Sequence, residues 1–126
     1  QRKQLGGGMR QSGVLAAAGL YALEHNLNRL NVDHNNASIL AQKLSRNSVF
    51  HVRHNLTHTN IVYADIEKDK AETMHVHLSR NNIKVNSPEP VIFDENIWYR
   101  FRFVTHLNIN DEDIDRLVDC INTFDG

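Results

Sequence analysis

The residues best suited to chemistry stand at the start of the chain, where three glycines precede a helix. Gly6, Gly7 and Gly8 are followed by Arg10 and then by an apolar stretch. Glycine permits backbone conformations that side chains forbid, and a helix N-terminus presents free N–H groups to an anion. Lys3 and Arg10 flank the loop, and both can pair with a phosphate or carboxylate. The segment therefore predicts either a tight turn or an anion site, and its spacing fits neither the P-loop nor the dinucleotide fingerprint.

A second candidate is the aromatic and basic stretch over residues 98–106, which has the alternation of a strand. Alternation places Arg100 and Arg102 on one face and a set of aromatic side chains, expected to be core, on the other. The aromatic face holds Tyr99, Phe101, Phe103 and Thr105. A partly buried guanidinium needs a carboxylate or phosphate partner. The two arginines thus indicate a ligand site, a structural ion pair or an exposed sheet face.

Neither the histidines nor the single cysteine makes a convincing catalytic or metal pattern. His51, His54 and His58 have the spacing of helical metal ligands, but their segment has the character of a strand and loop. We expect surface histidines and no metal site. Cys120 lies in the last amphipathic segment, where a small buried residue is expected rather than a nucleophile.

Hydrophobic periodicity predicts the elements that must position these residues. Expected helices cover 12–25, 28–46, 69–81 and a last segment that begins at Asn110 or Asp111 and runs to about residue 124; expected strands cover 49–52, 61–66, 83–85, 91–93 and 97–105. Prolines keep residues 87–90 out of any helix, so a loop is expected there. Mixed strands and helices with a late hairpin predict an α+β domain, a small antiparallel-type sheet with helices on one face.

Composition and net charge limit the classes of binding partner that can be expected. The 126 residues carry a formal net charge of −1, which gives no electrostatic case for nucleic acid or an anionic membrane as main partner. No apolar run has the length of a membrane span, about 20 residues. One cysteine and no secretory signal pattern predict a reducing, cytoplasmic setting.

The first helical segment, 12–25, is apolar on nearly all sides until Glu24. Such a helix is buried in a core or an interface, so it is expected to need a partner surface. The chain is therefore expected to be a piece of something larger.

Two strings of residues resemble one enzyme family. The string from Arg2 through Gly6–Gly8, Met9 and Arg10 to Gly13, followed by an alanine-rich helix, is similar to low-specificity threonine aldolases. The Leu30-x-x-Asp33-His34 segment and the Arg102–Leu107 segment resemble the same family in the same order. The similarity covers nearly the whole chain.

The resemblance implies a pyridoxal 5'-phosphate-dependent lyase of fold type I, the aspartate-aminotransferase-like class, which cleaves L-threonine or L-allo-threonine to glycine and acetaldehyde. This chain looks like its C-terminal portion: 1–25 would end the large-domain segment, and 26–126 would contain connecting helices and the small C-terminal domain. The resemblance also implies a homodimer or tetramer. The expected partners are therefore the rest of the same polypeptide, a second copy of it and an amino-acid substrate.

The resemblance also implies residue roles. Arg102 matches the arginine that grips the substrate carboxylate, and Lys3 matches an active-site lysine near the substrate. Arg10, with Gly6, Gly7 and Gly8, matches a region at the cofactor phosphate, while Arg100 has no family match and is expected to be structural.

One element of the family is missing. Its Schiff-base lysine lies in a Ser-x-Lys-Gly sequence upstream of the glycine loop, and that sequence is absent here. The fragment is therefore expected to be inactive alone and not to bind the cofactor by itself. Two alternatives remain: a stand-alone, non-catalytic α+β interaction domain derived from the family, and a fold-type I enzyme acting on another amino acid.

Overall fold

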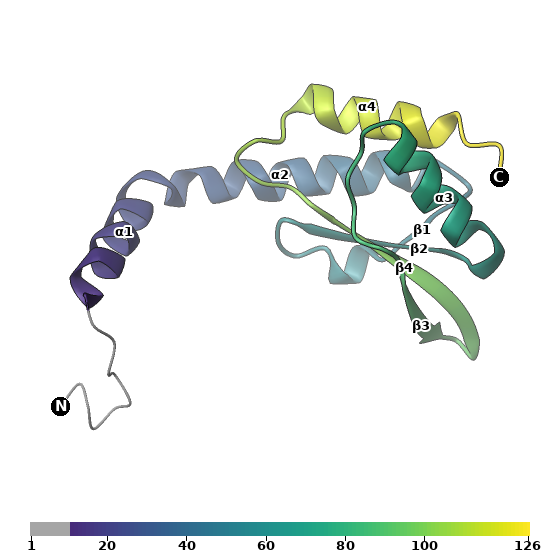
Figure 1. The fold of residues 1–126 in the computed structure, drawn as a ribbon, viewed down its shortest axis with the longest axis horizontal. Coiled ribbons are helices and arrows are strands. Elements are labelled where there is room, and N and C mark those ends of the chain that lie inside the picture. Colours follow the sequence, from purple (N-terminus) through teal and green to yellow (C-terminus); the bar gives the residue numbers. More distant parts are fainter. Residues whose placement is uncertain (1–10) are drawn as a thin grey trace. The chain divides into compact units, whose positions relative to one another are not determined.

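The computed structural model describes residues 11–126, which form a mixture of helices and strands (Figure 1). The helices are α1 Ser12–His25, α2 Leu27–Leu44, the short 3-10 helix η1 His54–Leu56, α3 Lys68–Arg80 and α4 Asp111–Asn122; the strands are β1 His51–Val52, β2 Ile61–Glu67, β3 Glu89–Phe93 and β4 Asn96–Val104. Of the helices that the structure describes, none is both long and apolar enough to cross a bilayer.

The chain divides into two compact units, residues 1–31 and 32–126, and the boundary falls within α2. In the described part of the first unit, α1 has no buried residue. Its large apolar side chains are more than half exposed, as in Val14 at 71%, Leu20 at 60% and Tyr21 at 61%. A domain boundary near residue 25, and a surface that covers this helix, stay predictions.

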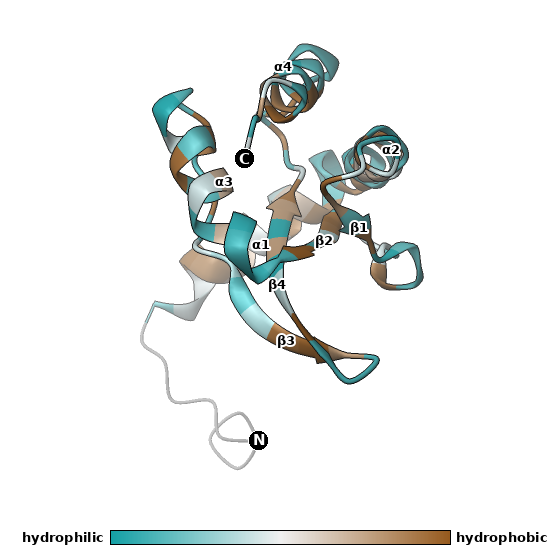
Figure 2. Ribbon diagram, turned by 90° about the vertical axis from the view of Figure 1, so that its right-hand side faces the viewer, coloured by the Kyte–Doolittle hydropathy of each residue, from teal (hydrophilic) through white to brown (hydrophobic). Residues whose placement is uncertain are grey.

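The second unit contains a four-stranded sheet in the order β1-β2-β4-β3, in which every neighbouring pair is antiparallel. The C-terminal part of α2, together with α3 and α4, lies on one side of this sheet (Figure 2). The expected α+β class, with a small antiparallel sheet and helices on one face, is confirmed. The other face of the sheet has no helix from this unit upon it.

The core lies between the sheet and the three helices. Phe101 and Phe103 on β4 point into it, and Phe50 meets both rings edge-on at centroid distances of 5.6 and 6.1 Å. The other contributors are the buried apolar residues of β2 and the helices: Ala37, Leu40, Ala41, Leu44, Val62, Ala64, Ile66, Ala71, Met74, Leu78, Ile114 and Ile121. The alternation predicted for β4 is thereby confirmed.

Two sequence-based expectations were wrong. Residues 83–85 are not a strand: Ile83 and Val85 pack against the core, but β3 already occupies the place beside β4. The loop expected over 87–90 instead ends in a strand, because β3 starts at Glu89 and includes Pro90. Proline is tolerated there because β3 is an edge strand, which leaves one row of backbone groups unpaired.

The last helix begins as expected. Asn110 is its N-cap, and its side chain accepts a hydrogen bond from the Asp113 backbone N–H at 2.9 Å. The Asp113 carboxylate accepts in return from the Asn110 N–H at 3.0 Å. This reciprocal capping box fixes where the chain turns from β4 into α4.

Candidate functional site

The helix-free face of the sheet carries the polar residues of the second unit. Asp65 on β2 stands opposite Arg100 on β4, and Tyr63 stands opposite Arg102. Glu89 on the edge strand β3 is the register partner of Arg100 on its other side. Since directly paired residues point to the same face, these five side chains share one surface.

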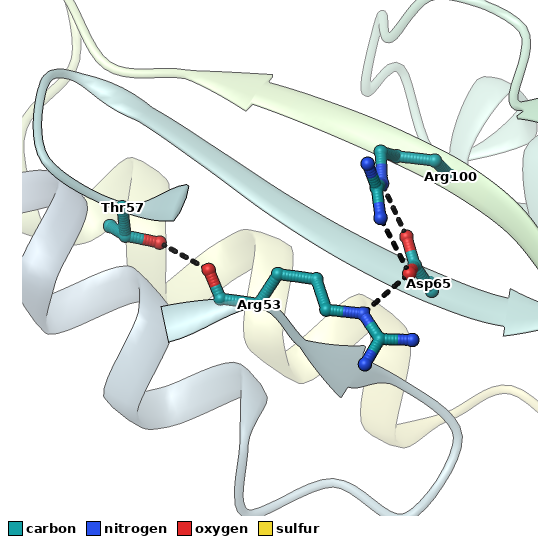
Figure 3. A network of polar contacts seen from close by, with 4 residues as sticks. All are labelled: Arg53, Thr57, Asp65 and Arg100. Atoms are coloured by element: carbon teal, nitrogen blue, oxygen red, sulfur yellow. Dashed lines mark hydrogen bonds and ion pairs between the residues drawn. The ribbon is translucent and has the colours of Figure 1, made fainter. Parts of the chain in front are cut away.

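A buried ion-pair network forms the centre of this face (Figure 3). Asp65 is completely buried and accepts two hydrogen bonds from Arg100, from Nε at 2.7 Å and from Nη2 at 2.9 Å. It accepts a third from Arg53 Nε at 2.6 Å. The side chains of Arg53 and Arg100 are only 16% and 23% exposed. The carboxylate is thus bridged by two guanidinium groups that also shield it from water.

The network sets the ionisation of its acid. Burial by itself would raise the pKa of Asp65, but the hydrogen bonds from Arg100 and Arg53 outweigh it and hold that pKa below its ordinary value. Asp65 in turn raises the pKa of Arg100 through the same hydrogen bond, so both groups are charged at neutral pH.

Arg102 differs from its neighbour. It is exposed, and within residues 11–126 no hydrogen bond or ion pair engages its guanidinium group. It lines a small pocket of about 200 Å³ on the open face. The other residues of the pocket wall are Tyr63, Asn86, Ser87, Glu89 and Arg100. The hydroxyl, amide and guanidinium groups among these lining residues are hydrogen-bond donors, which suit a carboxylate or another small oxyanion.

The β3–β4 hairpin covers part of the same face. Phe93, near its tip, lies under the Arg53 guanidinium, with the Cζ atom 3.7 Å from the ring centroid. Arg53 is therefore held between a carboxylate and an aromatic ring. Beside it, His51 meets Trp98 edge-on at 4.5 Å. These contacts fix the arginine network on its β1 side.

Two of the motifs quoted for the family resemblance meet in space. Thr105, the residue that follows β4, donates its hydroxyl proton to the Asp33 carbonyl oxygen on α2 at 2.7 Å. Asn60 donates its side-chain amide to the Thr105 carbonyl oxygen at 2.7 Å. The end of β4 is thus tied to α2 and to the start of β2, which restrains the strand that carries Arg102.

The remaining predicted site residues lie outside the described residues: Lys3, Gly6, Gly7, Gly8 and Arg10. Arg100, expected to be structural, is engaged by Asp65. Arg102 is the member of the predicted set that the structure describes, and its role stays a prediction.

Sequence reasoning missed Asp65, Arg53, Tyr63 and Glu89. A signal for Asp65 was present, because it is the one charged residue between Ala64 and Ile66 in an otherwise apolar strand. A carboxylate in such a place requires a cationic partner. The identity of the partners could not be read, because the pairing of β2 with β4 joins residues 35 apart.

Other reactive groups do not form a site in the described part of the chain. Among residues 11–126, no three His, Cys, Asp or Glu side chains lie close enough together to hold a metal ion. Cys120 is buried, and burial raises the pKa of its thiol, which disfavours the nucleophilic thiolate.

Comparison with known proteins agrees with the motifs. The family described as beta-eliminating lyase matches residues 1–67, just over half of the chain. A low specificity L-threonine aldolase of Escherichia coli strain K12 is 35% identical over 113 residues, which are 90% of this chain and 30% of that protein. A probable low-specificity L-threonine aldolase 2 of Arabidopsis thaliana is 37% identical over 119 residues, or 94% of this chain and 32% of that protein.

A shorter stretch of higher identity is found in Schizosaccharomyces pombe, where a probable low-specificity L-threonine aldolase is 54% identical over 41 residues, which are 32% of this chain and 11% of that protein. The Escherichia coli and Arabidopsis thaliana proteins match nearly all of this chain, but the chain spans only about a third of their length. The matched stretch lies in their C-terminal part. The family match over half of the sequence, joined to these similarities over nearly all of it, shows that the chain belongs to the beta-eliminating lyase family.

Proposed function

We propose that this chain is the C-terminal part of a pyridoxal-phosphate-dependent threonine aldolase, and that its open sheet face binds the carboxylate of the amino-acid substrate. The observation that carries the proposal is the contrast between the two arginines of β4. Arg100 is engaged by Asp65, whereas Arg102 lines the pocket with its guanidinium unengaged among the described residues. The relatives are named L-threonine aldolases, and the family resemblance implies the reaction: cleavage of L-threonine or L-allo-threonine to glycine and acetaldehyde.

Arg102 would bind and orient the substrate. A planar guanidinium pairs with a carboxylate through two parallel hydrogen bonds, which fixes both the position and the rotation of the amino acid. Tyr63, Asn86 and Ser87 line the same pocket, and their hydroxyl and amide groups are of the kind that can complete the coordination of the carboxylate oxygens. Such orientation determines which substituent of the α-carbon faces the reacting group.

The described residues do not make a pyridoxal phosphate site by themselves. None of the lysines among residues 11–126 lines the pocket beside Arg102. Lys43 pairs with Asp115, and Lys70 pairs with Glu67 at 2.8 Å. Asp65 is engaged by two arginines, which leaves Glu89 as the acid among the residues that line this pocket. We therefore derive no step through the cofactor from this part of the chain.

The cofactor site would be completed by residues outside the described part. We infer that Arg10, with Gly6, Gly7 and Gly8, contributes to the cofactor phosphate, and that Lys3 lies near the substrate. The Schiff-base lysine would come from an upstream segment of the same polypeptide, and the chain would not cleave threonine alone.

The exposed apolar surface of α1 supports this assignment to a larger protein. A helix whose apolar side chains are more than half exposed is unfavourable in an isolated domain and requires a covering surface. We infer that the rest of the polypeptide or a second copy of the enzyme covers it. A stand-alone interaction domain would need a more polar helix here. A cytoplasmic location is inferred from the single cysteine.

The proposal is tested by steady-state kinetics of the full-length protein with L-threonine, comparing Arg102→Lys with the wild type. Lysine keeps the charge but loses the bidentate geometry, so KM should rise and kcat/KM should fall by about tenfold to a hundredfold. Arg80→Lys, an exposed arginine on α3, is the matched control and should stay within about twofold. Unchanged kinetics in Arg102→Lys would remove Arg102 from the site.

A further inference from the structure

Two guanidinium groups line the Arg102 pocket, but they are not equivalent. Arg100 gives Nε and Nη2 to Asp65, which also holds Arg53. Arg102 has no such partner among residues 11–126. The pocket therefore presents one uncommitted cation and a second whose charge is already shared with a buried carboxylate.

A second acid reinforces this asymmetry. Glu89 is exposed, lines the same pocket and stands beside Arg100 in the β3–β4 register. The described ion pairs do not include Glu89, so its full negative charge remains at the pocket wall. Arg100 is thereby flanked by Asp65 on β2 and by Glu89 on β3. The charges facing the pocket favour one negative group beside Arg102 and oppose a second beside Arg100.

We propose that Asp65, supported by Glu89, is a specificity-determining residue that makes the pocket select ligands with a single carboxylate and reject dicarboxylates. The inference rests on the proposed function, because it assumes that Arg102 receives the substrate carboxylate. Asp65 acts through Arg100 and touches no substrate, so it is a positioning residue and not a catalytic one. Its effect is to exclude amino acids with an acidic side chain.

The physical basis is competition for the same donors. An acidic side chain that reaches Arg100 would have to displace Asp65 from two short hydrogen bonds and leave that carboxylate buried without them. It would also approach Glu89, a like charge. Replacing Asp65 by asparagine removes the competing charge and frees Arg100 to pair with a second ligand carboxylate. Discrimination against a close competitor commonly depends on such repulsive elements.

The test uses the full-length protein and two simple probes, propanoate with one carboxylate and succinate with two. Binding is followed by NMR titration of the arginine Nε–Hε signals, and the result is the ratio of the succinate affinity to the propanoate affinity. Asp65→Asn should raise this ratio about two- to fivefold, the range for a solvent-accessible ion pair. The double variant Asp65→Asn/Arg100→Gln should return the ratio to the wild-type value, because the freed cation is gone.

Further variants keep the test decisive. Glu89→Gln changes an exposed residue, so it should leave the fold intact and raise the ratio about twofold; it decides the matter if Asp65→Asn does not fold. Asp115→Asn, which removes an exposed acid on α4, is the control and should not change the ratio. If propanoate binds at Arg102 but neither Asp65→Asn nor Glu89→Gln changes the ratio, the inference is wrong and the proposed function stands. If propanoate leaves the Arg102 signal unshifted in the wild type, the proposed function fails, and the inference fails with it.

Discussion

Asp65 should be the most stabilising charged residue of the second unit, and replacing it by asparagine tests that directly. The substitution keeps the shape of the side chain and one oxygen acceptor while it removes the charge. It affects three short hydrogen bonds, at 2.6, 2.7 and 2.9 Å, and leaves two arginines facing a neutral group.

The magnitude follows from burial. Removing one partner of a buried ion pair typically costs about 3–5 kcal/mol, because the remaining charge stays buried without compensation. The side chains of Arg53 and Arg100 are still 16% and 23% exposed, so both can recover part of their hydration. We therefore expect Asp65→Asn to lower the free energy of unfolding by about 2–3 kcal/mol.

The assay is urea unfolding at pH 7, followed by circular dichroism, on the 126-residue chain. Asp115→Asn is the matched control, since Asp115 pairs with Lys43 but its side chain is 59% exposed. An exposed pair contributes up to about 1 kcal/mol, so the control should lose no more than that. Equal losses in the two variants would refute the reasoning, because they would show that the Asp65 network contributes no more than a surface ion pair.

Three further outcomes follow from the same structure. The pKa of Asp65 is lowered in the folded state, so its contribution to stability is present above the unfolded pKa, near 3.8, and is lost as the pH falls through the folded pKa. In urea titrations, the difference in unfolding free energy between the wild type and Asp65→Asn should therefore shrink below about pH 4. Asn110→Ala removes the capping-box acceptor of α4 and should cost about 1 kcal/mol, whereas an unchanged urea midpoint would show that the cap is dispensable. Phe101→Ala empties a fully buried position beside Phe50 and should cost about 3–5 kcal/mol in the same assay; a loss under about 1 kcal/mol would contradict the packing described for the core.

The fold was predictable where local periodicity and burial agree. The alternation of β4 predicted its aromatic core face, and the apolar run of β2 predicted a buried strand; both are confirmed. The segment 83–85 has the same apolar character, but its residues pack without joining the sheet. Periodicity reports burial, and only the pairing of strands decides which buried segment becomes a strand.

The candidate site was predictable only in part. Motif similarity indicated Arg102, and alternation placed Arg100 beside it on the same face. Neither signal could reveal that Asp65 binds Arg100 and leaves Arg102 unpaired among the described residues, because that contact depends on the register between β2 and β4. The contact between the Phe93 ring and the Arg53 guanidinium likewise depends on the β3–β4 hairpin, which brings together residues that are 40 positions apart in the sequence.

The most direct test of the central claim measures glycine release from L-threonine with and without pyridoxal phosphate, in the full-length protein and in the 126-residue chain. The account predicts cofactor-dependent glycine release by the full-length protein and none by the chain alone, because the proposed function takes the lysine that holds the cofactor from an upstream segment. Sustained cofactor-dependent glycine release by the 126 residues alone would contradict it, and so would a full-length protein that releases none.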